Sequence, residues 1–445
     1  MAFFIGPKRI VPLKLRKRNQ AASFAPPLLL LHRRVVILPD FMAQIKPFAA
    51  LRPKPEWAAA ICQLPYDVMS SAEAREMARG NPRSFLHVSK PEIDLPESVD
   101  FYDPRVYAKG VENFKLLMAE GALRQDNQPC FYFYRQIMGK HAQTGLVAVA
   151  SCEDYRDGIV KKHEFTRPDK EDDRVRHIEA LDSQTGPVFL VHRAVKELDD
   201  LAARIMASAP DTDFTAADGI QHTSWTVRDA AAIENIANIF DKMPALYIAD
   251  GHHRCAAASR VDLARDGADG SAFFLSVIFP HDQVQILPYH RVLKDLNGLT
   301  PAQLLQKLES VFTFGPSAPP QPGATHDVSL YLEGAWRALR FRPDFCAAKE
   351  AVERLDVSLL QRHVLDPIFG IEDPRTSKRI QFVGGIRGTP ELEKLVNNKE
   401  FACAFALFPT QIEELMAIAD AGGVMPPKST WFEPKLRDAM FCHMI

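Results

Sequence analysis

The stretch ALYIADGHHRCAAASRV, residues 245–261, decides the fold because it predicts a strand, a turn and a helix in immediate succession. The apolar run ends at Asp250, and Gly251 permits a tight turn. The alanines at 256–258 favour a helix that begins directly after the glycine. A strand followed at once by a helix is typical of a fold that mixes the two kinds of element.

Three residues in the first turn of that helix can carry positive charge: His252, His253 and Arg254. A helix start is the positive end of the helix dipole, which disfavours cations. A bound polyanion reverses this preference, because its oxygens accept hydrogen bonds from the free backbone N–H groups and from the guanidinium together. The turn therefore predicts a phosphate site formed with Gly251. In the structural alternative these side chains pair with carboxylates such as Asp250 or face water.

The composition is that of an ordinary globular protein. The chain has 445 residues, of which 47% are hydrophobic and 25% charged, so two or three domains with buried cores are expected. The net charge is −2, but residues 1–41 hold eight Lys or Arg and one acid, which gives +7 and leaves −9 for the remainder. Such a remainder has no general attraction for nucleic acid or for an anionic membrane.

The basic extension over residues 1–41 has two further interpretations, an organelle transit peptide and a nucleic-acid-binding arm. It contains several prolines and no sustained helical period, and the stretch MAQIKPFAALRPKP that starts at Met42 resembles the beginning of a domain. We favour Met42 as the physiological start.

Cysteine usage and hydropathy bear on the compartment. The seven cysteines are scattered, odd in number and nowhere form a C-x-x-C pair, which favours free thiols in a reducing, cytoplasmic environment over a zinc ribbon. No apolar run approaches the ~20 residues of a membrane-spanning helix. We therefore expect no membrane partner and no nucleic-acid partner.

Periodicity along the chain predicts a mixed α/β, or α+β, core. Apolar residues recur at spacings of three and four over residues 106–120, which indicates a helix that stops at Gly121. Two β-rich runs, 130–137 and 144–151, indicate a hairpin. Further strand candidates alternate with helical patterns up to a Pro- and Gly-rich break. The expected parts are an extension (1–41), a larger domain that carries the predicted phosphate site (42–313), a linker (314–327) and a smaller α+β unit (328–445).

Several ordered segments make the resemblance to a known family specific. ADGHHRCAAASR is similar to the phosphate-binding signature of the ParB and sulfiredoxin superfamily. From Met42 almost to its end, the chain resembles the family catalogued as domain of unknown function 1015. The matching segments are LPYDVMS, NPRSFLHVSKPEIDLP, KHEFTRPDKEDDR, ALYIADGHHR, ILPYHRVLKDLNGL, GIEDPRTSKRIQFVGGIRG and MPPKSTWFEPKL.

The resemblance implies a ParB/sulfiredoxin-like core with additional strands and helices. The best described relatives are free L-serine kinases, so it also implies phosphoryl transfer from ATP or ADP, with Mg²⁺, to the hydroxyl of L-serine. The alternative is a nucleotide-binding regulatory protein without turnover, and hydrolysis of the nucleotide alone is a third possibility. Sulfinic-acid reduction is disfavoured, because His252 stands where sulfiredoxins place their catalytic cysteine and Cys255 lies on the following helix. Partition by DNA binding is disfavoured by the −9 charge of the body.

The second chemical cluster is KKHEFTRPDKEDDRVRHIEAL, residues 161–181. Most of its charges fit a solvated, salt-bridged helix. His163 and Glu164, however, end a strand-like stretch before a proline, where a side chain can face a site. The segment lacks the second histidine of a zincin motif.

A kinase needs a carboxylate near the acceptor hydroxyl and cations around the phosphoryl group. Glu164 is our candidate base, with His163 beside it, and Asp67 and Asp250 compete for the role. Asp250 is also the expected Mg²⁺ ligand. The candidate phosphate clamps of this cluster are Arg167, Lys170 and Arg174.

The third cluster is AGGVMPPKSTWFEPK, residues 421–435. It is not a Walker loop, because a proline precedes the lysine where that loop requires glycine. Lys428, Ser429 and Thr430 offer a cation and two hydroxyls, so the loop is either a border of the active cleft or a structural loop. Two interpretations apply to the basic residues Arg375, Lys378 and Arg379: contact with a phosphate group and a structural role, of which the structural role is at least as well supported. We expect His87, His192 and His290 to have structural roles.

Overall fold

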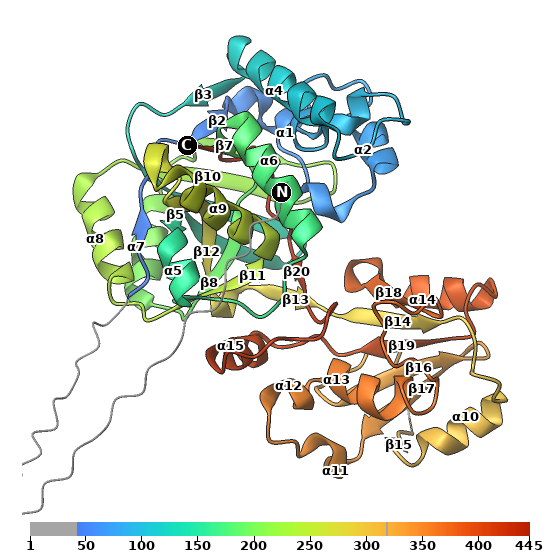
Figure 1. The fold of residues 1–445 in the computed structure, drawn as a ribbon. Helices are drawn as coiled ribbons and strands as arrows, with labels where there is room; N and C mark the ends of the chain where they lie inside the picture. The colour runs from blue at the N-terminus through green and yellow to red at the C-terminus, as the bar shows by residue number, and fades with distance from the viewer. Residues whose placement is uncertain (1–41, 317–318) are drawn as a thin grey trace, which may run out of the picture. The chain divides into compact units, whose positions relative to one another are not determined.

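A computed structural model describes residues 42–316 and 319–445, and these form an α+β fold (Figure 1). The expected fold class is therefore confirmed. The predicted basic extension lies outside the described residues, as do residues 317 and 318 of the predicted linker. The ParB/sulfiredoxin-like nature of the core stays a prediction.

A nine-stranded mixed sheet is formed by strands that lie between residues 45 and 280. Its order is β6-β11-β8-β12-β5-β4-β10-β9, and β1 pairs with β5 off this path. Strands β8 and β12 are parallel and so are β6 and β11, whereas the other pairs are antiparallel. The strands are β1 (Ile45–Lys46), β4 (Phe131–Met138), β5 (His141–Ser151), β6 (Val160–Lys161), β8 (Val188–His192), β9 (Thr212–Thr215), β10 (Gln221–Val227), β11 (Leu246–Asp250) and β12 (Phe273–Pro280).

Both faces of this sheet are buried, because successive side chains of a strand point to opposite sides. On β11, Leu246 and Ile248 pack with helices α5, α7, α8 and α9, whereas Tyr247 and Ala249 belong to the core on the other face. These four helices are α5 (Cys152–Asp157), α7 (Lys196–Met206), α8 (Ala230–Phe240) and α9 (His252–Arg265). A strand buried on both faces explains the continuous apolar run that precedes Asp250.

The remaining helices of this part lie in the segment before β4 and directly before β7. They are α1 (Ala58–Ile61), α2 (Ser71–Ala78), α3 (Leu86–Ser89), α4 (Pro104–Ala119) and α6 (Pro168–Leu181). Helix α4 is the helix predicted over residues 106–120. It begins after Asp103, whose side chain accepts from the Arg105 N–H, and Gly121 follows its end with a φ of +64°. The predicted hairpin is formed by β4 and β5.

A six-stranded sheet of order β15-β17-β16-β19-β14-β18 forms the second part. Its strands are β14 (Tyr289–Leu293), β15 (Phe312–Phe314), β16 (Asp327–Leu332), β17 (Ala335–Phe341), β18 (Ile380–Gly384) and β19 (Cys403–Leu407). Its helices are α10 (Pro301–Leu308), α11 (Pro343–Cys346), α12 (Ala351–Arg354), α13 (Asp356–Leu360), α14 (Gly388–Asn397) and α15 (Ile412–Asp420). Strands β14 and β15 precede the predicted linker at 314–327, which therefore connects two strands of one sheet.

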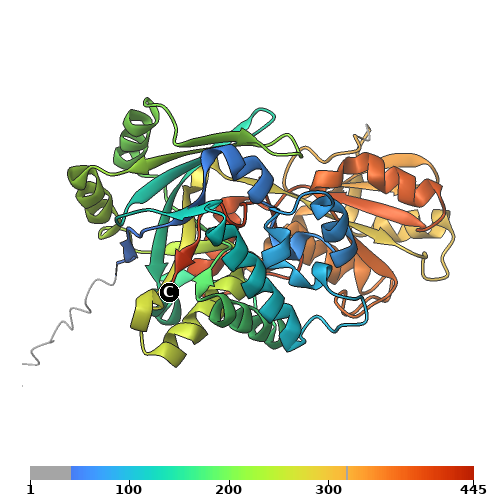
Figure 2. The same cartoon turned by 90° about the horizontal axis from the view of Figure 1, so that it is seen from above.

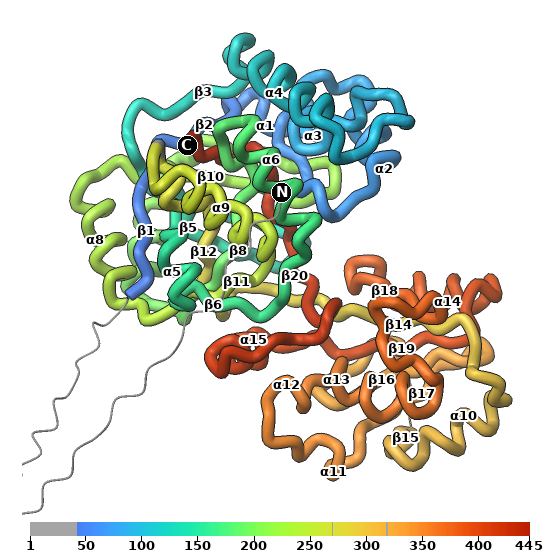
Figure 3. Tube along the Cα trace, in the orientation of Figure 1, coloured from blue at the N-terminus to red at the C-terminus, as the bar shows by residue number. Residues whose placement is uncertain are grey.

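The C-terminal segment returns to the large sheet. Figure 2, the view from above, shows this segment beside the strands of that sheet. Strand β20 (Trp431–Glu433) pairs with β13 (Gln285–Leu287), and β21 (His443–Met444) pairs with β7 (Ser183–Gln184). Figure 3 shows the red end of the tube near β2 (Leu51–Pro53), which pairs with β3 (Leu123–Gln125). Phe432 and Phe441 belong to the same buried core as Tyr132 of β4. The C-terminal segment thus completes the core to which β4 belongs.

Two observations bear on the predicted compartment. All seven cysteines are unpaired, and six of them are buried. Among residues 42–316 and 319–445, no helix combines the length and the apolar character needed to cross a membrane.

Candidate active site

The site is built around the turn between β11 and α9. Gly251 has a φ of +94°, and a Cβ on this residue would lie 3.4 Å from Val188 Cα and 3.6 Å from Arg254 Nη1. These contacts would be ordinary ones, so it is the left-handed backbone conformation that favours glycine here. The predicted strand, glycine and helix are present in that order, and α9 runs for 14 residues from His252.

Arg254 is buried at the start of α9, with 9% of its surface exposed. Its Nη1 donates to the backbone oxygen of Pro187, and its Nη2 lies 3.6 Å from Asp67 Oδ2. Its Nε and Nη2 have no hydrogen-bond partner among the described residues. Burial opposes the charge, but Asp67 and Asp250 outweigh it and hold the guanidinium pKa above its ordinary value. Buried donors without acceptors are costly, so this geometry fits a phosphate group that supplies acceptor oxygens.

Asp250, at the end of β11, is held by two donors. Its Oδ1 accepts from the Gly251 N–H at 2.9 Å, and its Oδ2 accepts from Lys435 Nζ at 3.0 Å. Burial alone would raise the pKa of Asp250, but Lys435 and Arg254 outweigh this effect and hold the pKa well below its usual range. Because Lys435 already neutralises this carboxylate, Asp250 is a poorer Mg²⁺ ligand than its sequence position predicts.

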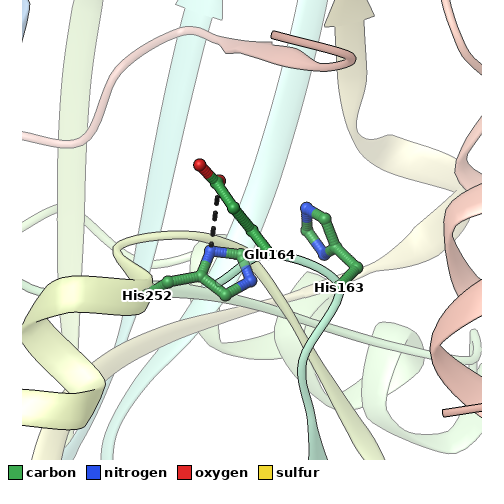
Figure 4. A group of neighbouring side chains, drawn as sticks. All are labelled: His163, Glu164 and His252. Carbon is green, nitrogen blue, oxygen red and sulfur yellow. Dashed lines mark ion pairs between the residues drawn. The ribbon is translucent and has the colours of Figure 1, made fainter. Parts of the chain in front are cut away.

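His163, Glu164 and His252 converge at the same turn (Figure 4). His252 Nδ1 lies 3.8 Å from Glu164 Oε2, and the two imidazole rings meet edge to face with centroids 4.5 Å apart. Both histidines are almost fully buried, whereas 50% of the Glu164 side chain is exposed. Glu164 is therefore the member of this cluster that a substrate can reach.

Burial sets the protonation of this cluster. It lowers the pKa of His163 to about 4 and lowers the pKa of His252 well below its ordinary value, so both rings are neutral at pH 7. It raises the pKa of Glu164, and the nearby carboxylates of Asp250 and Asp67 raise it further, against the opposing charge of Lys428. A carboxylate with a raised pKa is a stronger base than an ordinary glutamate.

The three predicted phosphate clamps, Arg167, Lys170 and Arg174, lie in different surroundings. Arg167 is exposed and pairs with Asp169 at 2.9 Å, although its backbone N–H donates to His253 Nε2 at 3.0 Å. Lys170 Nζ contacts the Tyr102 hydroxyl at 3.4 Å. The side chains of Arg167 and Lys170 are therefore engaged with surface neighbours of their own.

Arg174, by contrast, is half-buried beside the site. It pairs with Asp173 at 2.6 Å, and its guanidinium carbon lies 3.8 Å from the centre of the Tyr66 ring. Arg174, Tyr66 and Arg254 line a small cavity of about 40 Å³ together with Asp438. Burial raises the pKa of Asp438 to about 7. A side chain at Gly186 would collide with this carboxyl, because its Cβ would lie 2.6 Å from Asp438 Oδ1.

The predicted loop at 421–435 reaches the site through Lys428 and Lys435. Lys428 Nζ is exposed and lies 3.5 Å from the Tyr289 hydroxyl, close enough to Glu164 to act on its charge. Ser429 is buried and donates to the Pro426 oxygen at 2.6 Å, which gives it a structural contact. Thr430 is half-buried next to it.

The residues below contact neighbours of their own. Arg375 pairs with Asp373, and Arg379 pairs with Asp295. His87 contacts Asp94 at 2.8 Å, His192 contacts the Arg193 oxygen at 2.7 Å, and His290 Nδ1 accepts from the Leu407 N–H at 3.3 Å.

Sequence reasoning missed four residues of the site: Tyr66, Tyr289, Lys435 and Asp438. Tyr66 directly precedes Asp67 in the quoted LPYDVMS segment, and Lys435 lies in the quoted MPPKSTWFEPKL segment. The available signal for these two residues was their position beside candidate site residues in the quoted segments. Nothing in the sequence connects Asp438 to Arg254, because 184 positions separate them.

Comparison with known proteins gives one family and several solved structures. The model of the family described as "Protein of unknown function (DUF1015)" matches residues 45–358. No curated protein matches the chain. "Free serine kinase in complex with AMP" shares 16% identity at a TM-score of 0.34, and the match covers 64% of this chain and 86% of that one.

Two other solved structures are similar to the same extent. "SbnI with C-terminal truncation from Staphylococcus aureus" shares 12% identity at a TM-score of 0.36, over 66% of this chain and 85% of that one. A conserved hypothetical protein from Pyrococcus furiosus shares 15% identity at a TM-score of 0.32, over 66% and 93%. Similarity at this level carries no statement about activity.

Proposed function

The chain belongs to the DUF1015 family, and on the geometry of its site we propose that this member is a phosphotransferase, which passes a phosphoryl group from ATP or ADP to the hydroxyl of a small acceptor. One observation carries the proposal. The half-exposed Glu164 carboxylate lies 3.8 Å from His252 Nδ1 at the start of α9, and Arg254 in the same turn is buried with two nitrogens that have no hydrogen-bond partner among the described residues. A base and a phosphate-binding group are therefore adjacent.

The nucleotide phosphates bind at the first turn of α9. The free backbone N–H groups of this turn point along the helix axis, and the helix dipole favours negative charge there. Arg254 supplies Nε and Nη2, which have no hydrogen-bond partner in the described part of the chain. His253 stands in the same turn as a neutral ring, because burial lowers its pKa. Lys428 lies on the acceptor side, near Glu164.

Glu164 accepts the proton of the acceptor hydroxyl. The hydroxyl oxygen forms a bond to the terminal phosphorus of the nucleotide while the bond from that phosphorus to the bridging oxygen breaks, so that ADP leaves from ATP and AMP leaves from ADP. Asp250 is less suited to be the base, because Lys435 binds its carboxylate. Asp67 lies toward Arg254 and helps to keep that guanidinium in place.

Mg²⁺, when bound, neutralises charge on the phosphate oxygens. Carboxylate oxygens are the donors it prefers, and Asp67 beside Arg254 would be its ligand, since Lys435 already binds Asp250. L-serine is the acceptor that the family resemblance implies.

The regulatory alternative predicts that the carboxylates lie far from Arg254. The 3.6 Å contact between Asp67 and Arg254 supports the catalytic proposal instead.

Phosphorus NMR tests the proposal directly. The full chain is incubated with ATP or ADP, Mg²⁺ and L-serine or other small hydroxyl compounds, and a new phosphomonoester signal is expected with at least one of them. Loss of the nucleotide to inorganic phosphate alone would replace the kinase with a hydrolase, and an unchanged spectrum across all acceptors would reject both.

A further inference from the structure

We propose that His163, Glu164 and His252 form a binding site for one divalent transition-metal ion of the Zn²⁺ class, and that this ion and phosphoryl transfer exclude one another. Each residue offers one ligand atom, and the three atoms all lie within 4.8 Å of one another (Figure 4). The metal-binding part of the proposal stands on this geometry alone. The exclusion of transfer rests on the proposed function.

The donor set selects the kind of metal. Two imidazoles and one carboxylate are ligands that Zn²⁺, Co²⁺, Ni²⁺ and Fe²⁺ accept. Mg²⁺ prefers an all-oxygen environment, so it is a poor competitor at this cluster. Donor atoms around a tetrahedral Zn²⁺ are about 3.3 Å apart, given Zn–N and Zn–O bonds of about 2.0–2.1 Å. The three groups therefore need to close by up to about 1.5 Å, which side-chain rotations supply.

A second observation points to a missing partner inside the cluster. His163 Nδ1 and His252 Nε2 are buried and have no hydrogen-bond partner among the described residues. His252 Nδ1 and Glu164 Oε2 are 3.8 Å apart, which is too long for a hydrogen bond. Three polar groups are thus held together without satisfying one another. A cation between them would give lone pairs of both rings and of the carboxylate a common partner.

The surroundings hold the two rings in place. The backbone of Ile248 hydrogen-bonds the His163 ring, and the backbone oxygen of His163 accepts from the Met425 N–H at 2.8 Å. His252 is fixed as the first residue of α9. A backbone contact to the ring is a common way to orient a metal-binding histidine.

Metal binding and base catalysis compete for one carboxylate. A carboxylate that ligates a dication is a much weaker base, because the ion stabilises its charged form. The half-exposed position of Glu164 lets an ion enter from solvent, and it leaves room on the metal for water. Zn²⁺ at this site is therefore expected to inhibit transfer even at saturating Mg²⁺.

Visible absorption of Co²⁺ tests the site in the full chain after treatment with a chelator. One Co²⁺ per chain is expected to give the ligand-field bands of a site with nitrogen and oxygen donors, and Zn²⁺ but not millimolar Mg²⁺ is expected to displace it. Glu164→Gln and His252→Asn are each expected to weaken Co²⁺ binding by at least about 10-fold. His253→Asn removes a neighbouring histidine outside the cluster and is expected to leave Co²⁺ binding unchanged.

Equal Co²⁺ affinity in the wild type and in both cluster variants would overturn the metal site. Glu164→Gln keeps this test decisive if the buried His252→Asn variant fails to fold. A chain that binds Co²⁺ at the cluster but transfers no phosphoryl group would retain the metal site and reject the proposed function. A chain that transfers phosphoryl groups with or without bound Zn²⁺ would reject the exclusion.

Discussion

Lys435 Nζ lies 3.0 Å from Asp250 Oδ2, although 185 positions separate the two residues in the chain. Asp250 ends a strand of the large sheet, and Lys435 belongs to the C-terminal segment that follows β20. Burial alone would lower the pKa of Lys435, but Asp250 outweighs it and raises the pKa. This half-buried pair connects the C-terminal segment to the turn at Gly251, and its removal has a predictable effect.

Lys435→Met is expected to destabilise the protein by about 1–3 kcal/mol, because it leaves the half-buried Asp250 charge without its lysine. Chemical denaturation with urea measures the change in the free energy of unfolding. The double variant Lys435→Met/Asp250→Asn removes both charges. Its loss of unfolding free energy is expected to be smaller than the sum of the losses in the two single variants. Additive losses would show that the two side chains do not stabilise one another.

Arg254→Ala is expected to weaken nucleotide binding by about 10- to 100-fold, because charged hydrogen bonds to phosphate are lost. Isothermal titration with ADP or ATP measures the affinity. Arg260→Ala is the matched control, since Arg260 lies on the same helix but is partly exposed and pairs with Glu171 and Asp172. Unchanged affinity in Arg254→Ala would mean that the phosphates bind elsewhere.

Glu164→Gln is expected to retain nucleotide binding and to lower the transfer rate by about 10²- to 10⁴-fold, because the amide cannot take the acceptor proton. The phosphomonoester formed per unit time, followed by phosphorus NMR, gives the rate. Glu179→Gln on the exposed face of α6 serves as the control. A fully active Glu164→Gln variant would move the base to Asp67 or Asp250.

Asp438 predicts a pH dependence of stability. Its carboxyl keeps its proton up to a pKa of about 7 in the folded protein, whereas the unfolded chain releases it near the ordinary value of about 3.9. Between these values the folded state binds more protons than the unfolded state, so stability is lost as the pH rises from about 4 to 7. The slope is at most about 1.4 kcal/mol per pH unit for one group.

Asp438→Asn is expected to remove this pH-dependent component and to stabilise the protein at pH 8 relative to the wild type. Urea denaturation at pH 5, 6, 7 and 8 measures the effect. Asp344→Asn, at an exposed position of α11, is expected to leave the pH profile as it is. Parallel profiles for the wild type and Asp438→Asn would show that this carboxyl ionises normally.

Local pattern predicted much of the secondary structure. The strand, glycine and helix around Gly251, the helix before Gly121 and the hairpin of β4 and β5 each depend on neighbouring residues, so their propensities are visible in a short window. The linker at 314–327 is also visible as a break. The sheet to which its two ends belong is not visible in a short window, because β14 and β15 join β16–β19 through pairings between distant segments.

The sequence by itself determined the parts of the site that neighbours in the chain define: the turn at Gly251, the cations that follow it, and Glu164 at the exit of a short strand. Only the tertiary structure decided that Lys435 neutralises Asp250, that Asp438 lies beside Arg254, and that His163 and His252 meet around Glu164. The physical reason is that turns and caps depend on local backbone geometry, whereas burial and the distances between charges depend on how the C-terminal segment folds back on the large sheet. The residues next to a lysine or an aspartate in the sequence do not indicate which charged group it will contact in the folded protein.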